Sequence, residues 1–231
     1  MSQDIRDNYI EVRERMETAC KLAGRDSADV RLVAVSKYVP VERMQQAYDL
    51  GIRHFGENHA QELHQKQTFF EQEGCKPHFI GHLQTNKLKY LCGYAAMVES
   101  VDRLSLVEAM ENRCAKLEIV ADVLIQINIG AEPQKSGVLP DGLAKLAQAV
   151  VDCSNLRLRG VMCVPPAVPA NEARFYFAKT RELFAGLRNT YPKERIDTLS
   201  MGMSHDYEAA ILEGATQVRI GSALFGARSQ V

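Results

Sequence analysis

The chain has 231 residues, of which 46% are hydrophobic and 25% charged, a composition typical of a globular protein. Its formal net charge of -1 and pI of about 6.6 argue against a general electrostatic affinity for nucleic acid or an anionic membrane. The six cysteines occur singly, without a CxxC pair, so neither a metal site nor a disulfide framework is indicated.

The N-terminus is charged from its first residues and has no apolar core of a signal peptide. No apolar stretch reaches the length of a membrane span. Scattered cysteines in apolar contexts are typical of buried thiols in a reducing compartment. We therefore expect a cytoplasmic protein that binds neither nucleic acid nor membrane.

Apolar residues recur at spacings of three and four through residues 3–23, which predicts an amphipathic helix that Gly24 ends. We expect residues 1–25, which contain it, to pack on the remainder of the chain. Further helical patterns occupy 41–51, part of 170–190 and 205–214. Between the helical segments, strand-like apolar runs occur at 31–37, 54–58, 78–83, 95–101, 121–128, 156–164, 198–202 and 217–225.

These runs are nearly continuous rather than alternating, which indicates a parallel sheet covered on its outer face. Eight strand–helix units in roughly 200 residues favour a (β/α)8 barrel. A doubly wound sheet would need GxGxxG after the first strand, but that strand runs into SKYVP at 36–40. The prediction is an α/β protein: a single (β/α)8 TIM-type barrel domain over 1–231 with an extra N-terminal helix.

In such a barrel the chemistry lies at the carboxyl ends of the strands, where the following loops form one rim. Several strand ends here carry polar residues: Lys37, Glu57, Asn58, His82, Gln84, Asn128, Ser200, Ser204, Arg219 and Ser222. Each has an ordinary explanation, such as a helix cap for Asn58, a hydrogen-bonded core position for His82, or an ion pair for Glu57 with a barrel cation. Their number at one rim is what suggests a site.

Lys37 follows the buried run Val33–Val35. A lysine just past a strand is commonly a solvated surface residue whose stem lies on apolar neighbours. In a barrel mouth the loss of solvation would instead favour the neutral amine, a nucleophile toward an aldehyde. Position alone favours the two interpretations about equally.

Two turns rich in small residues follow the seventh and eighth strands, where barrels of this type frequently hold a phosphate. Ser200–Ser204 precedes a helix that Ser204 is expected to cap, and Gly221 with Ser222 offers a second close backbone approach. Arg219 alternates with its apolar neighbours and so points to the opposite side of the sheet from them, either in an ion pair with a neighbouring carboxylate or as a cation directed into the barrel mouth. An amine and a phosphate cradle would suit a ligand with both an aldehyde and a phosphate, either pyridoxal 5′-phosphate (PLP) or a phosphorylated sugar.

Seven segments resemble one known family: VAVSKYVP (33–40), HFGENHAQEL (54–63), HFIGHLQTNK (78–87), INIGAEPQKSG (127–137), GVMCVPP (160–166), LSMGMSHDYEAAILEG (199–214) and VRIGSALFG (218–226). They resemble the pyridoxal phosphate homeostasis proteins, whose barrel is similar to the N-terminal domain of alanine racemases. The resemblance implies that Lys37 holds PLP as a Schiff base. It further implies that Ser200, Met201, Gly221 and Ser222 border the phosphate, Arg219 faces the pyridine nitrogen and Asn58 lines the pocket.

The resemblance also implies a role in the homeostasis of this vitamin B6 cofactor, buffering or delivering PLP, with no assigned catalytic residue. Racemases of this type need a second domain that supplies an opposing base, and this chain ends six residues after Phe225. We expect little turnover, a monomer, and PLP-dependent apo-enzymes as recipients. A PLP-dependent amino-acid racemase, with His82 as a poor second base, and a Schiff-base aldolase acting on a phosphosugar are the alternatives.

Overall fold

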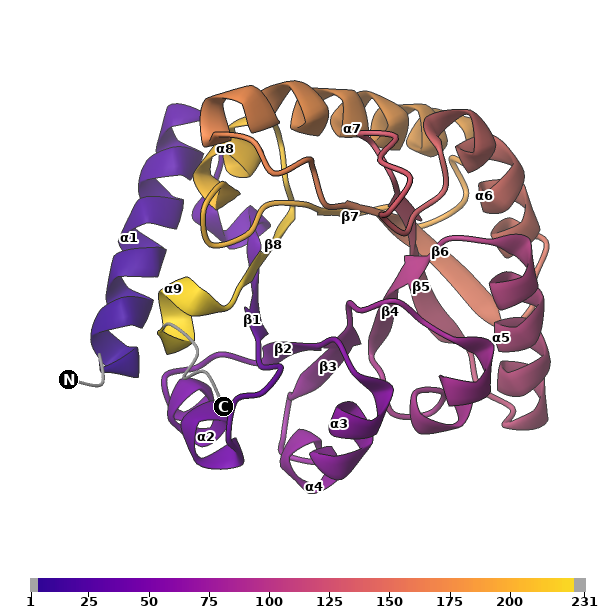
Figure 1. Ribbon diagram of the computed structural model, residues 1–231, viewed down its shortest axis with the longest axis horizontal. Coiled ribbons are helices and arrows are strands. Elements are labelled where there is room, and N and C mark those ends of the chain that lie inside the picture. Colours follow the sequence, from indigo (N-terminus) through magenta and orange to yellow (C-terminus); the bar gives the residue numbers. More distant parts are fainter. Residues whose placement is uncertain (1–3, 227–231) are drawn as a thin grey trace.

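The computed structural model describes residues 4–226, so the ends of the predicted domain at 1–3 and 227–231 lie outside the described residues. The predicted N-terminal helix is confirmed as α1 (Ile5–Leu22), which begins after the Asp4 cap. It lies against the last helices of the chain (Figure 1), where Asn8 donates a 2.9 Å hydrogen bond to the Leu224 carbonyl.

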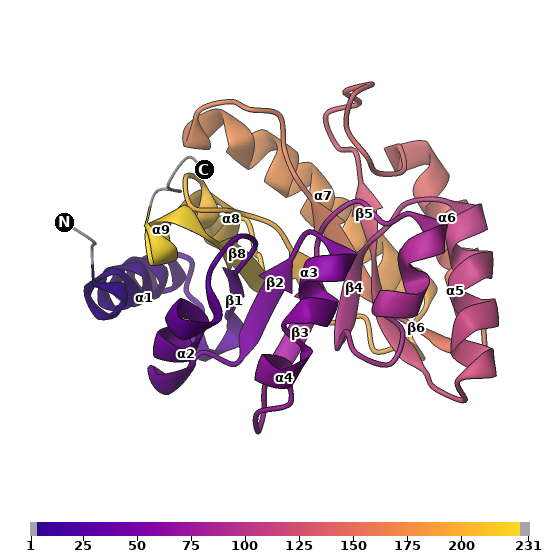
Figure 2. The ribbon, with the colours of Figure 1, turned by 60° about the horizontal axis from the view of Figure 1, so that its bottom comes forward.

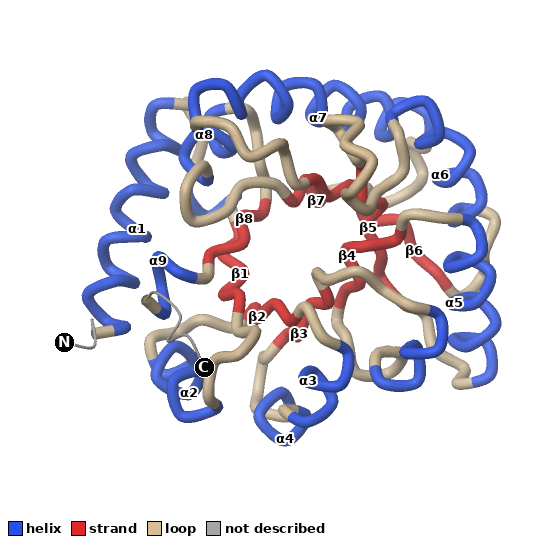
Figure 3. Tube along the Cα trace, in the orientation of Figure 1, coloured by secondary structure: helices blue, strands red, loops and turns tan. Residues whose placement is uncertain are grey.

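Eight parallel strands form a closed barrel in chain order, which confirms the predicted (β/α)8 fold (Figures 1 and 3). Strands β8 and β1 close it, with Val218 opposite Leu32 and Ile220 opposite Ala34. The strands are β1 (Arg31–Val35), β2 (His54–Glu57), β3 (Lys76–Phe79), β4 (Met97–Val101), β5 (Ala121–Ile127), β6 (Leu156–Cys163), β7 (Thr198–Ser200) and β8 (Gln217–Ile220).

The predicted run at 217–225 is wrong as one strand. β8 ends at Ile220, because Gly221 leaves the extended conformation (φ -114°, ψ -78°), and Ser222–Phe225 form a short helix. The third strand also begins earlier and ends earlier than its apolar run, at Lys76 and Phe79, since Ile80 to Leu83 belong to the rim.

Helices surround the barrel (Figure 2) and bury one apolar stripe each against the strands. None of those in residues 4–226 has the length and apolarity that a membrane crossing requires. They are α2 (Val41–Asp49), α3 (Ala60–Gln65), α4 (Gln67–Phe70), α5 (Leu104–Lys116), α6 (Leu143–Val151), α7 (Ala170–Thr190), α8 (Tyr207–Leu212) and α9 (Ser222–Phe225), with 3₁₀ turns η1 (Ser27–Asp29), η2 (Thr85–Tyr90) and η3 (Pro140–Gly142).

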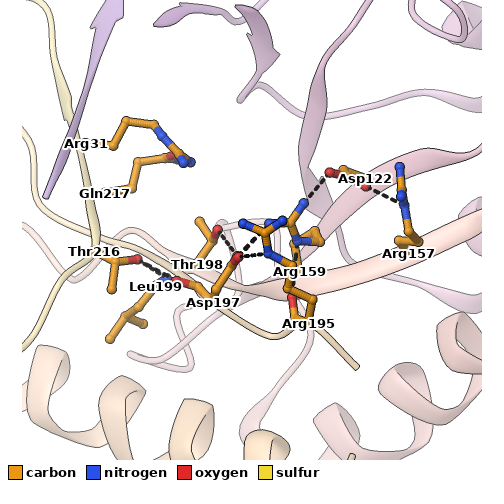
Figure 4. Close-up of polar contacts among 10 residues, drawn as sticks. All are labelled: Arg31, Asp122, Arg157, Arg159, Arg195, Asp197, Thr198, Leu199, Thr216 and Gln217. Carbon is orange, nitrogen blue, oxygen red and sulfur yellow. Dashed lines mark hydrogen bonds and ion pairs between the residues drawn. The ribbon is translucent and has the colours of Figure 1, made fainter. Parts of the chain in front are cut away.

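The amino ends of β5 and β6 and the segment before β7 are joined by an ion-pair network (Figure 4). Arg159 on β6 pairs with Asp122 on β5 and with Asp197, and the Arg159 Nη2 to Asp197 Oδ2 distance is 2.6 Å. Thr216 and Arg195 also contact the Asp197 residue. In barrels of this kind, this end of the strands serves stability rather than chemistry.

Candidate functional site

A cavity of about 390 Å³ opens at the carboxyl ends of the strands. It brings together residues from β1 and the loop after it, from the loops after β2, β3, β6 and β7, and from β8 with the turn that follows it. Its lining consists of Val35, Lys37, Asn58, Ile80, Val164, Met203, Ser204, His205, Arg219, Gly221 and Ser222. Within residues 4–226, no three His, Cys, Asp or Glu side chains form a group that could hold a metal ion.

Five of the seven residues predicted for a ligand site line this cavity: Lys37, Asn58, Arg219, Gly221 and Ser222. They come from three strand ends that are adjacent in the barrel order, since β8 pairs with β1 and β1 with β2. The amine, a guanidinium and a hydroxyl therefore face one space.

Ser200 and Met201 do not line the cavity. Met201 is fully buried in the core outside the barrel, and Ser200 is fully buried among polar side chains inside it. Their predicted role beside a phosphate stays a prediction. From the same loop, Met203, Ser204 and His205 reach the cavity instead; of these, the strand pattern selected Ser204 but not Met203 or His205.

Ser204 does not cap the following helix, contrary to the prediction. Helix α8 begins at Tyr207, and the Asp206 carboxylate before it accepts the Met203 N–H at 2.6 Å. Ser204 Oγ instead accepts the backbone N–H groups of Gly221 and Ala223, at 3.3 and 3.2 Å. Two amide donors thus converge on one oxygen at the edge of the cavity, an arrangement suited to anion oxygens.

Arg219, which lines the cavity, is fixed by hydrogen bonds to buried groups of the barrel. It is 3% exposed, and its guanidinium donates to Ser200 Oγ at 2.7 Å and to the Cys163 carbonyl at 2.8 Å. Ser200 in turn donates to Glu99 Oε2 at 2.6 Å. Burial opposes the charge of Glu99, but the hydrogen bonds from His78 and Ser200 and the Arg219 charge hold its pKa below the usual range.

The polar chain continues toward the amino ends of the strands. Glu99 accepts from His78 Nδ1 at 2.7 Å, and His78 Nε2 lies 2.9 Å from His54 Nδ1. Because the ionised carboxylate only accepts, His78 carries a proton on Nδ1, and a hydrogen bond joins its Nε2 to His54 Nδ1. Burial and the neighbouring His78 lower the pKa of His54 to about 3, so this ring is neutral. Sequence reasoning missed this chain.

Asn58 is placed by a close approach of two loops. Gly81, two residues after β3 ends, runs so near to Asn58 that a Cβ on it would lie 2.0 Å from the Asn58 carbonyl oxygen. Helix α3 has His59 as its N-terminal cap residue, so Asn58 is not the helix cap. The Asn58 side chain is therefore available to the cavity.

Glu57 pairs with a cation, as one interpretation of the sequence had it, but on the outer side of the barrel. Lys66, between α3 and α4, lies 2.9 Å from Glu57 Oε1. His82 is not the core histidine expected: its side chain is 53% exposed, with Nδ1 3.0 Å from Ser136 Oγ.

The closed barrel and its rim cavity define a (β/α)8 protein of the alanine racemase type, and residues 3–229 match the model of the alanine racemase N-terminal domain. A pyridoxal phosphate homeostasis protein of Pseudomonas aeruginosa is 44% identical over 226 residues, with 97% of this chain and 96% of that protein covered. One from Aquifex aeolicus is 43% identical over 218 residues, with 94% and 95% covered. The chain belongs to the pyridoxal phosphate homeostasis protein family.

A solved structure with PLP bound is also similar to this chain, that of PipY from Synechococcus elongatus PCC7942. It superposes with a TM-score of 0.78 at 32% identity, and the match covers 93% of this chain and all of that one. The likeness therefore extends over the barrel rather than over one motif.

Proposed function

We propose that this protein binds pyridoxal 5′-phosphate in the rim cavity, held as a Schiff base on Lys37, and that it buffers or delivers the cofactor inside the cell. The observation that carries the proposal is that Lys37, Arg219 and the Gly221–Ser222 turn line one cavity. The relatives named for pyridoxal phosphate homeostasis support the same role.

The residues present fit this ligand. The cavity volume of about 390 Å³ lies in the range of small-molecule sites. The amide donors of Gly221 and Ala223 already converge on one oxygen, that of Ser204, and such backbone donors suit a phosphate. Lys37 and Val35 line the same cavity, so an amine that can condense with an aldehyde is present in it.

When bound, the cofactor would supply an aldehyde, which the Lys37 amine would hold as a Schiff base with release of water. Arg219 stays charged and is fixed by Ser200 and the Cys163 carbonyl. A permanent cation placed against the pyridine nitrogen disfavours its protonation and so weakens carbanion stabilisation. A cation in this place supports binding with little or no turnover.

In this proposal the chain acts as a single-domain monomer, PLP-dependent apo-enzymes are recipients, and amino- and keto-acid metabolism is affected indirectly. A cytoplasmic location agrees with the six free cysteines, five of them buried. An apo-aminotransferase should regain activity faster when the PLP-loaded protein is added than when buffer alone is added. That result would support delivery of PLP. Gel filtration with light scattering tests the monomer.

The deciding experiment is an absorbance spectrum of the purified protein, followed by borohydride reduction and peptide mass spectrometry. We expect an imine absorbance band and the reduced adduct on Lys37, both lost in Lys37→Ala. Wild-type protein that stays colourless with added PLP overturns the proposal. If the protein exchanged the α-proton of an amino acid with solvent deuterium at a rate typical of enzymes, on the order of 10 per second, the proposal that it has little or no turnover would be wrong.

A further inference from the structure

Lys37 lies in a tight turn that begins where β1 ends. The turn is closed by the Val39 N–H, which donates to the Ser36 carbonyl at 3.0 Å. Tyr38 has a φ of 61°, a left-handed conformation that a bulky side chain rarely adopts. Such a backbone persists only where the surrounding contacts determine it. The residues that hold Tyr38 in this conformation therefore also fix the direction in which the Lys37 side chain leaves the turn.

Lys66 makes the densest set of these contacts. It is 8% exposed, and its ammonium lies 2.7 Å from the Ser36 carbonyl oxygen, 2.9 Å from Glu57 Oε1 and 2.7 Å from Glu62 Oε1. A lysine ammonium has three donors, and three acceptors surround this one. We call Lys66, Glu57 and Glu62 the Lys66 cluster.

The Lys66 cluster holds the chain on both sides of Lys37. On the N-terminal side, Lys66 binds the Ser36 carbonyl, and Ser36 Oγ donates to Glu57 Oε1 at 2.7 Å. On the C-terminal side, Glu62 Oε1 accepts the Tyr38 N–H at 2.6 Å. The two peptide groups that flank Lys37 are therefore attached to one buried cluster of charges.

The cluster acts from outside the cavity. Alternation along the strand puts Val35 and Lys37 on the cavity side and the fully buried Ser36 on the side of the helices. None of the three residues of the Lys66 cluster lines the cavity. A change in Glu62 therefore reaches a bound ligand through the turn that carries Lys37, whereas a change in Lys66 also affects Glu57, the chain neighbour of the cavity residue Asn58.

Electrostatics make the arrangement hard to replace. Glu57 is fully buried; burial raises its pKa, and the Lys66 charge opposes that rise. Without Lys66, the pKa of the buried Glu57 carboxyl would rise further, and the Ser36 carbonyl and Glu62 would lose their shared donor. The fold could persist, but the turn would lose its fixed geometry.

We propose that Lys66 is a positioning residue that, with Glu62, holds the Lys37 amine where it meets the cofactor aldehyde. The inference rests on the proposed function, since it concerns the same lysine. It assigns no contact with the ligand to the Lys66 cluster. It predicts that loss of the cluster weakens the covalent part of binding and leaves the remaining contacts unchanged.

The test compares two ligands, PLP and pyridoxine 5′-phosphate, in which an alcohol replaces the aldehyde so that no Schiff base can form. In Lys66→Met and Glu62→Ala we expect PLP affinity to fall at least about tenfold, the equivalent of about 1.4 kcal/mol. Affinity for pyridoxine 5′-phosphate should stay within about twofold, since a change below about 0.4 kcal/mol is expected where no contact is lost. The Tyr38 amide should also exchange its hydrogen faster in the ligand-free variants.

Two matched variants serve as controls. Glu62→Gln keeps an oxygen that accepts from the Tyr38 N–H, so PLP affinity should remain close to that of wild type. Lys145→Met makes the same chemical change as Lys66→Met at an exposed position of α6 and should alter neither ligand. If Lys66→Met does not fold, Glu62→Ala decides, because Glu62 is only half-buried.

Unchanged PLP affinity in the folded variants overturns the inference while leaving the proposed function intact. An equal loss of both ligands overturns it as well, because that result means general damage to the cavity. A wild-type protein that binds pyridoxine 5′-phosphate but forms no imine with PLP overturns the proposed Schiff base, and the positioning role with it.

Discussion

The Arg219 guanidinium lies 2.7 Å from the hydroxyl oxygen of Ser200, in the interior of the barrel. That hydroxyl also donates to Glu99, which Gln217 and His78 contact from other sides. The cation at the base of the cavity is therefore linked to a buried carboxylate through one hydroxyl group. Because Arg219 and Glu99 are both buried, the free energy of unfolding depends on this hydroxyl.

Ser200→Ala should lower the free energy of unfolding by about 1–3 kcal/mol, because it leaves the Arg219 Nη1 donor and Glu99 Oε2 without this partner in a buried site. Urea denaturation measures the change. Ser222→Ala, at an exposed hydroxyl in the cavity lining, should change stability by no more than about 0.5 kcal/mol. Equal effects of the two substitutions would contradict the role of Ser200.

The pH dependence of stability should report on His54, whose pKa burial and the neighbouring His78 lower from 6.5 to about 3. The unfolded chain binds the proton more readily, so this ring contributes stability above pH 6.5 that is lost as the pH falls toward 3. Glu99, with a depressed pKa, adds a loss only below its ordinary value of 4.5. The window between pH 4.5 and 6.5 therefore isolates His54 from Glu99.

We expect His54→Gln to flatten the fall in stability across that window, measured by urea denaturation at several pH values. The amide side chain can still form a hydrogen bond with His78, as donor or as acceptor, but does not titrate. The wild-type slope in the variant would show that another group causes the acid sensitivity.

Gly81 should tolerate no side chain, since its Cβ would lie 2.0 Å from the Asn58 carbonyl oxygen. Gly81→Ala forces one of the two rim loops to move, at a cost of about 1–3 kcal/mol. It should also weaken PLP binding, because Asn58 lines the cavity. Gly186→Ala is the matched control, because nothing lies within 4 Å of the position of its added Cβ. Alanine is more stable than glycine inside a helix, so this change in α7 should raise the free energy of unfolding by about 0.5–1 kcal/mol. Thermal unfolding of both variants measures the two changes in stability. A Gly81→Ala protein as stable as wild type would contradict the close approach of Gly81 to Asn58.

The sequence allowed much of the rim to be predicted because a parallel barrel brings all strand ends to one side. Lys37, Asn58 and Arg219 lie far apart in the chain, yet each follows or ends an apolar run, and the structure places them around one cavity. Ser200 has the same sequence signal but faces Glu99 inside the barrel. A strand end alone does not say whether a side chain stops below the cavity or reaches it.

The Lys66 cluster was not predictable in the same way. Glu62 and Lys66 have the spacing of an ordinary surface ion pair on a helix, and nothing in that spacing shows that Lys66 is buried. Its role depends on the contacts of Glu62 and Lys66 with the turn after β1, which join segments far apart in the sequence. Glu99 gave a better signal, a charged residue inside the apolar run 95–101, which calls for a buried partner.

The ion-pair network at the amino ends of the strands should contribute to stability in proportion to burial (Figure 4). Arg159, with a side chain 14% exposed, bridges Asp122 and Asp197, whereas Arg195, 82% exposed, contacts only Asp197 of that pair. Arg159→Ala leaves two partly buried carboxylates without their shared cation and should cost about 1–3 kcal/mol. Arg195→Ala should cost no more than about 1 kcal/mol, and PLP affinity should change in neither, since both lie at the far end of the barrel. Urea denaturation and PLP titration separate the two effects. Equal losses of stability in the two variants would mean that burial does not set the strength of this network.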